Sequence, residues 1–317
     1  MMQCPGRCSA GLSVNFLLFW ILALLFWQMS STAVLAQERH PEAFGVHDGT
    51  QLRIVGSTTI QPIVQEVANL YCKQTGPRIL LQGGGSSFGI AAVRAMTADI
   101  GMVSRELTPE ETDEFEHVVI GYDAVAIIVN SHNPRQAVSK EELRDIYTGR
   151  TKTWFPGQEG QADIVLVSKL IGRGTLAIFE AYTGLRSPFH APAVPHEQDQ
   201  ETISTSAWEA GANLDSILWV GGMRGAIGFV SIGDTQRFIR LGMPIRVLEV
   251  DHTLPIPEQV TEGTYPLRRR LHLVYLRGNA RAEEFARFML TTPGQTEVLE
   301  QGFIPVPAPG GPWEAKP

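Results

Sequence analysis

One pattern recurs along this chain: a short apolar strand, a turn of glycine and hydroxyl residues, and then a helix. In its clearest copy, residues 79–81 are apolar, residues 83–89 read Gly-Gly-Gly-Ser-Ser-Phe-Gly, and apolar residues return at helical spacing over 90–96. Strands that alternate with helices favour parallel or mixed sheets, so the pattern predicts an α/β architecture. The other copies have their turns at 56–59, 104–105 and 172–175.

Turns of this kind can hold an anion. Glycine lets the backbone approach a ligand closely, the first N–H groups of a helix lack partners within the helix, and the helix dipole places partial positive charge there. A single such turn is usually architecture, and Thr58 or Thr59 could simply cap the helix that follows. The repetition favours an oxyanion site, with neutral hydroxyl donors at Ser57, Thr58, Thr59, Ser86, Ser87, Ser104 and Thr175.

The composition limits the partners. The 317 residues include 26 basic and 33 acidic ones, a net charge of -7, and no basic patch stands out, so we expect no nucleic acid partner. Because the overall field repels anions, an anion must be bound by local donors. The chain is long enough for two domain-sized cores.

Residues 1–36 have the features of a secretory signal peptide. Arg7 is the only charged residue in this segment, residues 16–27 are apolar, and small residues precede a predicted cleavage after Ala36. An uncleaved membrane anchor is the alternative, because the uncharged run is long. Either way we expect the folded part to be periplasmic or secreted, and loss of Arg7 would make the net charge -8.

The cysteine content and the two ends of the chain give further predictions. Beyond the predicted signal, Cys72 is the only cysteine, which excludes an intramolecular disulfide and a cysteine metal site, and we expect a buried, inert thiol at a helix end. Residues 37–49 are predicted to form a polar leader. Residues 308–317 are predicted to be a disordered tail. We expect no metal and no cofactor.

Local signals locate the other elements. Thr108 and Ser139 begin capping boxes, Gly149 and Gly184 are expected to end helices, and Thr292 is expected to cap the last helix. The predicted strands lie near 52–55, 79–81, 99–103, 122–129, 164–167, 226–230, 245–250 and 271–276. The predicted helices cover 60–71, 90–96, a segment that starts after Thr108, one that starts after Ser139, 176–182, 213–220, 281–290 and 293–301.

Nine segments together resemble the phosphate-binding (PstS-like) proteins of ABC transporters, in the type II periplasmic binding protein class. They cover residues 50–307 in the expected order. The segments are LRIVGSTTIQP, QGGGSSFGI, ADIGMVSREL, DAVAIIVN, LRDIYTGRTKTW, GRGT, GAIGFVSIG, GTYPLRRRLHLVY and PGQTEVLEQGFIPV.

The resemblance implies a binding protein and not an enzyme. Its two α/β lobes, residues 50–129 plus 235–307 and residues 130–234, would close on a tetrahedral oxyanion and deliver it to an ABC permease. We expect a monomer. The resemblance places ligand contacts on Ser57, Thr58, Thr59, Ser86, Ser87, Ser104, Arg105, Arg173, Gly174 and Thr175.

The departures from this family concern the choice of anion. Aspartates are common in the family at the positions of Ser104 and Ile171, a serine at that of Arg173 and an arginine at that of Lys169. A carboxylate there could accept the proton that phosphate carries and sulfate lacks. The cationic residues suit a fully ionised or larger anion, while phosphate remains the expected ligand.

Two other functions fit parts of the sequence. Residues 85–89 match the G-x-S-x-G elbow of α/β-hydrolases, in which Ser87 would be the nucleophile and His252 or His272 its partner. That motif does not explain the other three hydroxyl turns. A sensor or adhesion module with the same fold, but without transport, is the second alternative.

Overall fold

A computed structural model describes residues 51–75, 78–155, 163–190 and 200–306. These residues belong to one compact unit, His47–Pro317. The predicted signal, leader and tail lie outside the described residues. Within these ranges no helix combines the length and the apolar character needed to cross a bilayer.

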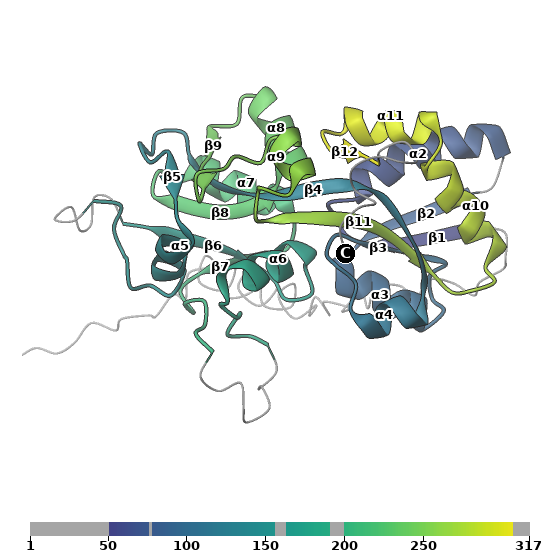
Figure 1. Ribbon diagram of the computed structural model, residues 1–317, viewed down its shortest axis with the longest axis horizontal. Coiled ribbons are helices and arrows are strands. Elements are labelled where there is room, and N and C mark those ends of the chain that lie inside the picture. Colours follow the sequence, from purple (N-terminus) through teal and green to yellow (C-terminus); the bar gives the residue numbers. More distant parts are fainter. Residues whose placement is uncertain (1–50, 76–77, 156–162, 191–199, 307–317) are drawn as a thin grey trace, which may run out of the picture. The chain divides into compact units, whose positions relative to one another are not determined.

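Strands dominate the centre of the fold (Figure 1). Their order in the main sheet is β2-β1-β3-β11-β4-β8-β6-β7, with β9 and β12 paired to β4, and β5 and β10 form a separate pair. The strands are β1 Gln51–Gly56, β2 Arg78–Gly83, β3 Ile100–Val103, β4 Glu116–Asn130, β5 Ala137–Val138, β6 Val165–Lys169, β7 Trp208–Ala210, β8 Ala226–Ser231, β9 Ile245–Val247, β10 Glu249–Val250, β11 Arg268–Tyr275 and β12 Ile304–Pro305.

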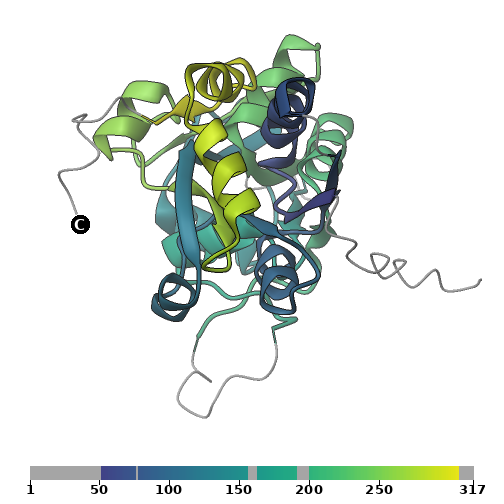
Figure 2. The same ribbon diagram turned by 90° about the vertical axis from the view of Figure 1, so that its right-hand side faces the viewer.

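Helices cover both faces of the sheet (Figures 1 and 2). In the half that contains β1, β2 and β3, α2, α10 and α11 lie on one face and α3 and α4 on the other. The helices are α2 Gln61–Thr75, α3 Ser86–Arg94, α4 Pro109–Glu114, α5 Lys140–Tyr147, α6 Gly174–Thr183, α7 Asn213–Gly222, α8 Ile232–Arg240, α9 Pro257–Glu262, α10 Ala280–Met289 and α11 Thr292–Glu300. The sheet is mixed, because β1 pairs in parallel with β2 and β3, whereas β11 is antiparallel to β3 and β4. The predicted α/β class is confirmed.

Most of the buried apolar side chains form two clusters, and β4 belongs to both. Buried residues from Leu52 to Ile120 and from Leu271 to Phe303 form one cluster, whereas those from Ala124 to Leu267 form the other. The first part of β4 pairs with β11 as far as Ala124, and from Val125 onward β4 pairs with β8. A single strand therefore links the two cores.

Most helix ends follow the expected local chemistry. The side chains of Thr108 and Ser139 accept from the backbone of Glu111 and Glu142, and these glutamates return the bond, which confirms both capping boxes. Gly184 ends α6 with φ 71° and Gly149 follows α5 with φ 80°, left-handed conformations that glycine adopts without strain.

Other local predictions were wrong or incomplete. The N-cap of α11 is Thr291, not Thr292, and its side chain makes no capping bond. Helix α8 was missed, because Gly233 suggested a turn, whereas this glycine lies in the first turn of the helix, against the ring of Phe303. Cys72 is a free cysteine inside α2 and is partly exposed, not buried.

Candidate functional site

Three serine hydroxyls meet where neighbouring strands end. Strands β2, β1 and β3 are adjacent and parallel, so their carboxyl ends lie at the same edge of the sheet. Ser57 follows β1, Ser86 begins α3 after β2, and Ser104 follows β3, and all three are buried. Ser57 Oγ donates to Ser104 Oγ at 2.7 Å, and Ser86 Oγ lies 3.4 Å from Ser104 Oγ. The topology thus gathers residues that are 47 positions apart.

Glycine makes this close approach possible. Gly56 has φ 134°, and a Cβ atom there would lie 2.4 Å from the carbonyl oxygen of Met102 on β3. The carbonyl oxygen of Gly56 accepts bonds from the N–H groups of Gly84 and Gly85. The 56–59 turn and the 83–89 turn are therefore joined directly through their backbones, and a side chain at position 56 would collide with the neighbouring strand β3.

The turn before α6 contacts the same cluster. Ser87 N donates to Gly172 O at 3.1 Å, and a Cβ atom at Gly174 would lie 2.7 Å from the hydroxyl oxygens of both Ser86 and Ser104. Thr175 is buried, 3 % exposed, in the first turn of the helix. The structure therefore brings the 172–175 turn, which follows a strand of the other core, against the three serines.

A buried arginine that the sequence reasoning missed lies at the centre of these groups. Arg269 on β11 is 2 % exposed, and its Nη1 donates to Ser104 O at 2.9 Å and to Thr175 Oγ1 at 3.1 Å. Its Nη2 donates to Thr59 Oγ1 at 3.3 Å. One guanidinium therefore contacts three of the four hydroxyl turns.

Asp123 on β4 holds this arginine in place. The two residues are directly opposite in the antiparallel β4–β11 pair, and Asp123 Oδ2 accepts from Arg269 Nη2 at 2.6 Å and from Nε at 2.9 Å. Neither side chain has any exposed surface. A buried arginine needs such a partner, because an unpaired charge in the interior is costly.

The remaining predicted residues are placed differently. Thr59 is buried and accepts from Asn213 Nδ2 at 3.2 Å, whereas Thr58 is partly exposed and Ser87 is exposed. Arg173 is the N-cap residue of α6, and burial lowers the pKa of its half-buried guanidinium. Its Nη1 has no hydrogen-bond partner in the described part of the chain.

Arg105 does not direct its fork into the cluster. Its Nη1 and Nη2 each donate to a carboxylate oxygen of Glu111 at 2.7 Å. Glu111 is also the residue that completes the capping box of α4. Burial opposes ionisation of Glu111, but the bonds from Arg105 and from the Thr108 backbone hold the pKa of its carboxyl below the usual value. The guanidinium that the sequence placed here is thus used to fix a helix start, and Arg269 takes the position that we expected for Arg105.

Besides Arg269, Lys169 on β6 is also a buried basic side chain. It is 1 % exposed, and its Nζ donates to Ala212 O at 2.8 Å. Burial lowers the pKa of Lys169 to about 7, although Asp234 and Asp215 act in the opposite direction. Burial also raises the pKa of the Asp234 carboxyl, despite the bond from Asn213.

The geometry gives no support to a hydrolase at Ser87. His272 is buried on β11 with its ring 5.9 Å from that of His117, and His252 is exposed in a left-handed turn. Among the described residues, no hydrogen bond joins Ser87 to either candidate histidine, and no cluster of three metal-binding side chains occurs.

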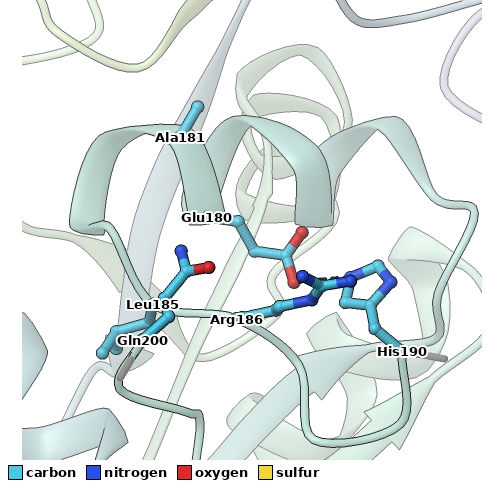
Figure 3. Close-up of a pocket in the computed structure, with 6 residues that line it drawn as sticks. All are labelled: Glu180, Ala181, Leu185, Arg186, His190 and Gln200. Carbon is cyan, nitrogen blue, oxygen red and sulfur yellow. Dashed lines mark hydrogen bonds and ion pairs between the residues drawn. The ribbon is translucent and has the colours of Figure 1, made fainter. Parts of the chain in front are cut away.

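A separate pocket of about 310 Å³ lies at the carboxyl end of α6 (Figure 3). Glu180 Oε1 is 2.9 Å from His190 Nε2 and also accepts from Ser187 N. The pocket is not lined by Ser57, Ser86, Ser104 or Thr175. The lining residues are Glu180, Ala181, Leu185, Arg186, His190 and Gln200.

Comparison with known proteins identifies the family. Residues 45–292 match the family described as the PBP superfamily domain. The chain belongs to this family. Proteins of similar sequence include the phosphate-binding protein PstS of Borreliella burgdorferi, which is 26 % identical over 79 % of this chain and 88 % of that protein. The phosphate-binding protein PstS 2 of Streptococcus pneumoniae is 43 % identical, but the match spans only 38 % of its length and 34 % of this chain.

Solved structures share the fold over most of the chain. A protein of Clostridium perfringens, solved with bound phosphate and named as a phosphate ABC transporter substrate-binding protein, has a TM-score of 0.69 at 27 % identity. An ABC-type phosphate transport receptor of Vibrio cholerae has a TM-score of 0.63 at 26 % identity. Each match covers 81 % of this chain and 100 % of the other chain. The predicted type II binding-protein fold is confirmed.

Proposed function

We propose that this protein captures inorganic phosphate, or a related tetrahedral oxyanion, outside the cytoplasm and delivers it to an ABC permease. The observation that carries the proposal is the convergence of Ser57, Ser86, Ser104 and Thr175 around one buried arginine, Arg269. The phosphate-binding proteins named above support the choice of ligand. Because those relatives are binding proteins, we propose capture without chemistry.

The proposed contacts are mainly neutral donors. A dehydrated anion is held well by several oriented hydroxyl and amide groups, which replace its hydration shell. Arg269 is already paired with Asp123, so it adds little net charge to the site. Arg269 takes the place of Arg105 in the set, which otherwise comprises Ser57, Thr58, Thr59, Ser86, Ser87, Ser104, Arg173, Gly174 and Thr175.

Two lobes that close on the anion would give the protein its mechanism. The two hydrophobic cores support a division of this kind, and they favour boundaries between Ile120 and Ala124 and between Leu267 and Leu271. These lie away from the boundaries after residues 129 and 234 that the sequence suggested. The contact between Ser87 and Gly172 would then be made on closure.

Calorimetry on the mature protein, stripped of bound anion, tests the proposal. The wild type should bind phosphate. Thr175→Ala should lower the affinity for phosphate about tenfold, which is the effect of one lost hydrogen bond to a charged ligand. Thr183→Ala is the matched control, because Thr183 is buried in the same helix and donates to Phe179 O at 2.8 Å. It should lower stability and leave affinity unchanged. Absence of binding by phosphate, arsenate, sulfate and molybdate would reject the proposal.

Our proposals for the cellular location and the oligomeric state of the protein rest on the sequence. We propose that residues 1–36 are removed on export and that the protein acts as a monomer. Amino-terminal sequencing of the exported protein should begin at Gln37, and sedimentation should give the mass of one chain. A start at Met1 would indicate a retained anchor instead.

A further inference from the structure

A buried hydrogen bond from Asn213 joins the two hydrophobic cores. Asn213 is the first residue of α7, a helix that packs in the core formed by residues 124–267. Its Nδ2 donates to Thr59 Oγ1 at 3.2 Å, and Thr59 lies in the 56–59 turn, next to Ile60 of the other core. The two residues are 6 % and 3 % exposed and 154 positions apart. The bond therefore exists only while the two cores lie against each other.

Asp234 holds the amide of Asn213 in place. This residue is in the first turn of α8, and its Oδ2 accepts from the same Nδ2 at 2.6 Å. Because a carboxylate accepts, the amide presents its nitrogen here and not its oxygen. The NH₂ group has two hydrogens, so it can bind Asp234 in its own core and Thr59 in the other core at the same time.

The bond from Asn213 also determines how the hydroxyl of Thr59 can be used. A hydroxyl has two acceptor lone pairs and one hydrogen. The Oγ1 atom of Thr59 accepts from Asn213 Nδ2 and, at 3.3 Å, from Arg269 Nη2. With both lone pairs occupied, Thr59 can offer only its hydrogen to a further partner, and a hydrogen is what an anion accepts. Arg269 also donates to Ser104 O and Thr175 Oγ1, so Thr59 and the proposed site form one hydrogen-bonded unit.

We propose that Asn213 is a positioning residue of the anion site, which acts through Thr59 without touching the anion. This inference rests on the proposed function. The bond from Asn213 to Thr59 stabilises the closed arrangement of the two lobes and keeps the Thr59 hydroxyl oriented as a donor. Without the amide, the closed form should open more often, and the bound anion should leave faster.

Phosphate binding to the mature protein, stripped of bound anion, tests this role. Asn213→Ala should lower phosphate affinity in calorimetry about three- to tenfold, the effect of one lost hydrogen bond. The loss should come mainly from faster dissociation, measured by rapid filtration of radiolabelled phosphate after a chase with unlabelled phosphate.

Asn130→Ala is the matched control. Asn130 is also a buried asparagine that binds α7, but its Nδ2 donates to Val220 O and Gly221 O, beside residues of a single core. This variant should lower the melting temperature and leave the affinity and the dissociation rate of phosphate unchanged. Equal dissociation rates in Asn213→Ala and Asn130→Ala would overturn the inference.

A double-mutant cycle shows whether Asn213 acts through Thr59. Thr59→Val keeps the shape of the side chain but removes the oxygen, so the amide has no bond to lose there. In this background Asn213→Ala should change phosphate affinity by less than about twofold, whereas fully additive losses would show that Asn213 acts elsewhere. Thr59→Val by itself leaves the bond between Asn213 and Asp234 intact and should speed phosphate dissociation. If it does not, the inference is wrong even where Asn213→Ala fails to fold.

The wild-type measurements distinguish this inference from the proposed function. If the wild type binds none of phosphate, arsenate, sulfate and molybdate, the proposed function fails. If the wild type binds phosphate and Asn213→Ala binds it as tightly, the function stands and the role of Asn213 is rejected.

Discussion

Breaking the buried pair between Arg269 and Asp123 should be among the most damaging single changes in this protein. In Arg269→Met, the carboxylate of Asp123 loses both of its hydrogen bonds inside a region without exposed surface. Loss of one partner of a fully buried ion pair costs about 3 to 5 kcal/mol, because the other charge stays unpaired. For a domain of this size the melting temperature should fall by roughly 10 °C.

Urea denaturation of the anion-free protein measures this cost, and a neighbouring pair provides the control. Arg270, the next residue, pairs with Glu106, but the two side chains are 52 % and 49 % exposed. Arg270→Met should therefore cost less than about 1 kcal/mol. The double variant Arg269→Met with Asp123→Leu should recover much of the loss, since no buried charge remains. A cost below about 1 kcal/mol for Arg269→Met alone would refute the reasoning.

Three further expectations concern other parts of the molecule. Arg105→Ala should lower the free energy of unfolding by about 1 to 2 kcal/mol, because its fork is bound to Glu111, and calorimetry should find phosphate affinity unchanged. Gly174→Ala should weaken phosphate binding about tenfold or more, since a Cβ atom would lie 2.5 Å from a backbone oxygen across the site. The control is Gly222→Ala, which should bind phosphate normally because a Cβ atom there would have nothing within 4 Å. Equal phosphate affinities of the two variants would contradict the prediction. Burial lowers the pKa of His272 to about 4, so between about 4 and 6.5 the unfolded chain binds a proton that the folded chain does not, and stability falls as the pH falls through this window. In His272→Phe, the free energy of unfolding measured with urea should depend less on pH in this window. An unchanged pH dependence would contradict this role of His272.

The architecture and the position of the hydroxyls could be predicted from sequence, because each depends on local patterns. Strand, glycine turn and helix are read from spacing, and parallel strands necessarily bring their carboxyl ends to one edge. Ser57, Ser86 and Ser104 meet for that reason. The prediction for Thr175 needed the family resemblance as well, since α6 follows a strand in the other core.

The charged centre of the site was not predicted, although weak signals were present. Asp123 is the only acidic residue in the apolar run 122–129, and Arg269 is the middle of three arginines on a strand whose side chains alternate between the two faces. Only the antiparallel register places these two residues opposite each other. Arg105 was misplaced because no local pattern showed that Glu111, six residues later, would bind it.

Strand β4 has a mechanical consequence. Its 15 residues are shared between two cores, so neither core can melt while the other keeps the whole strand. Cooperative units in proteins follow such shared elements. A scanning calorimeter should therefore record one heat-absorption peak for this two-core chain. Two halves that were joined only by a flexible linker could instead unfold in two separate steps.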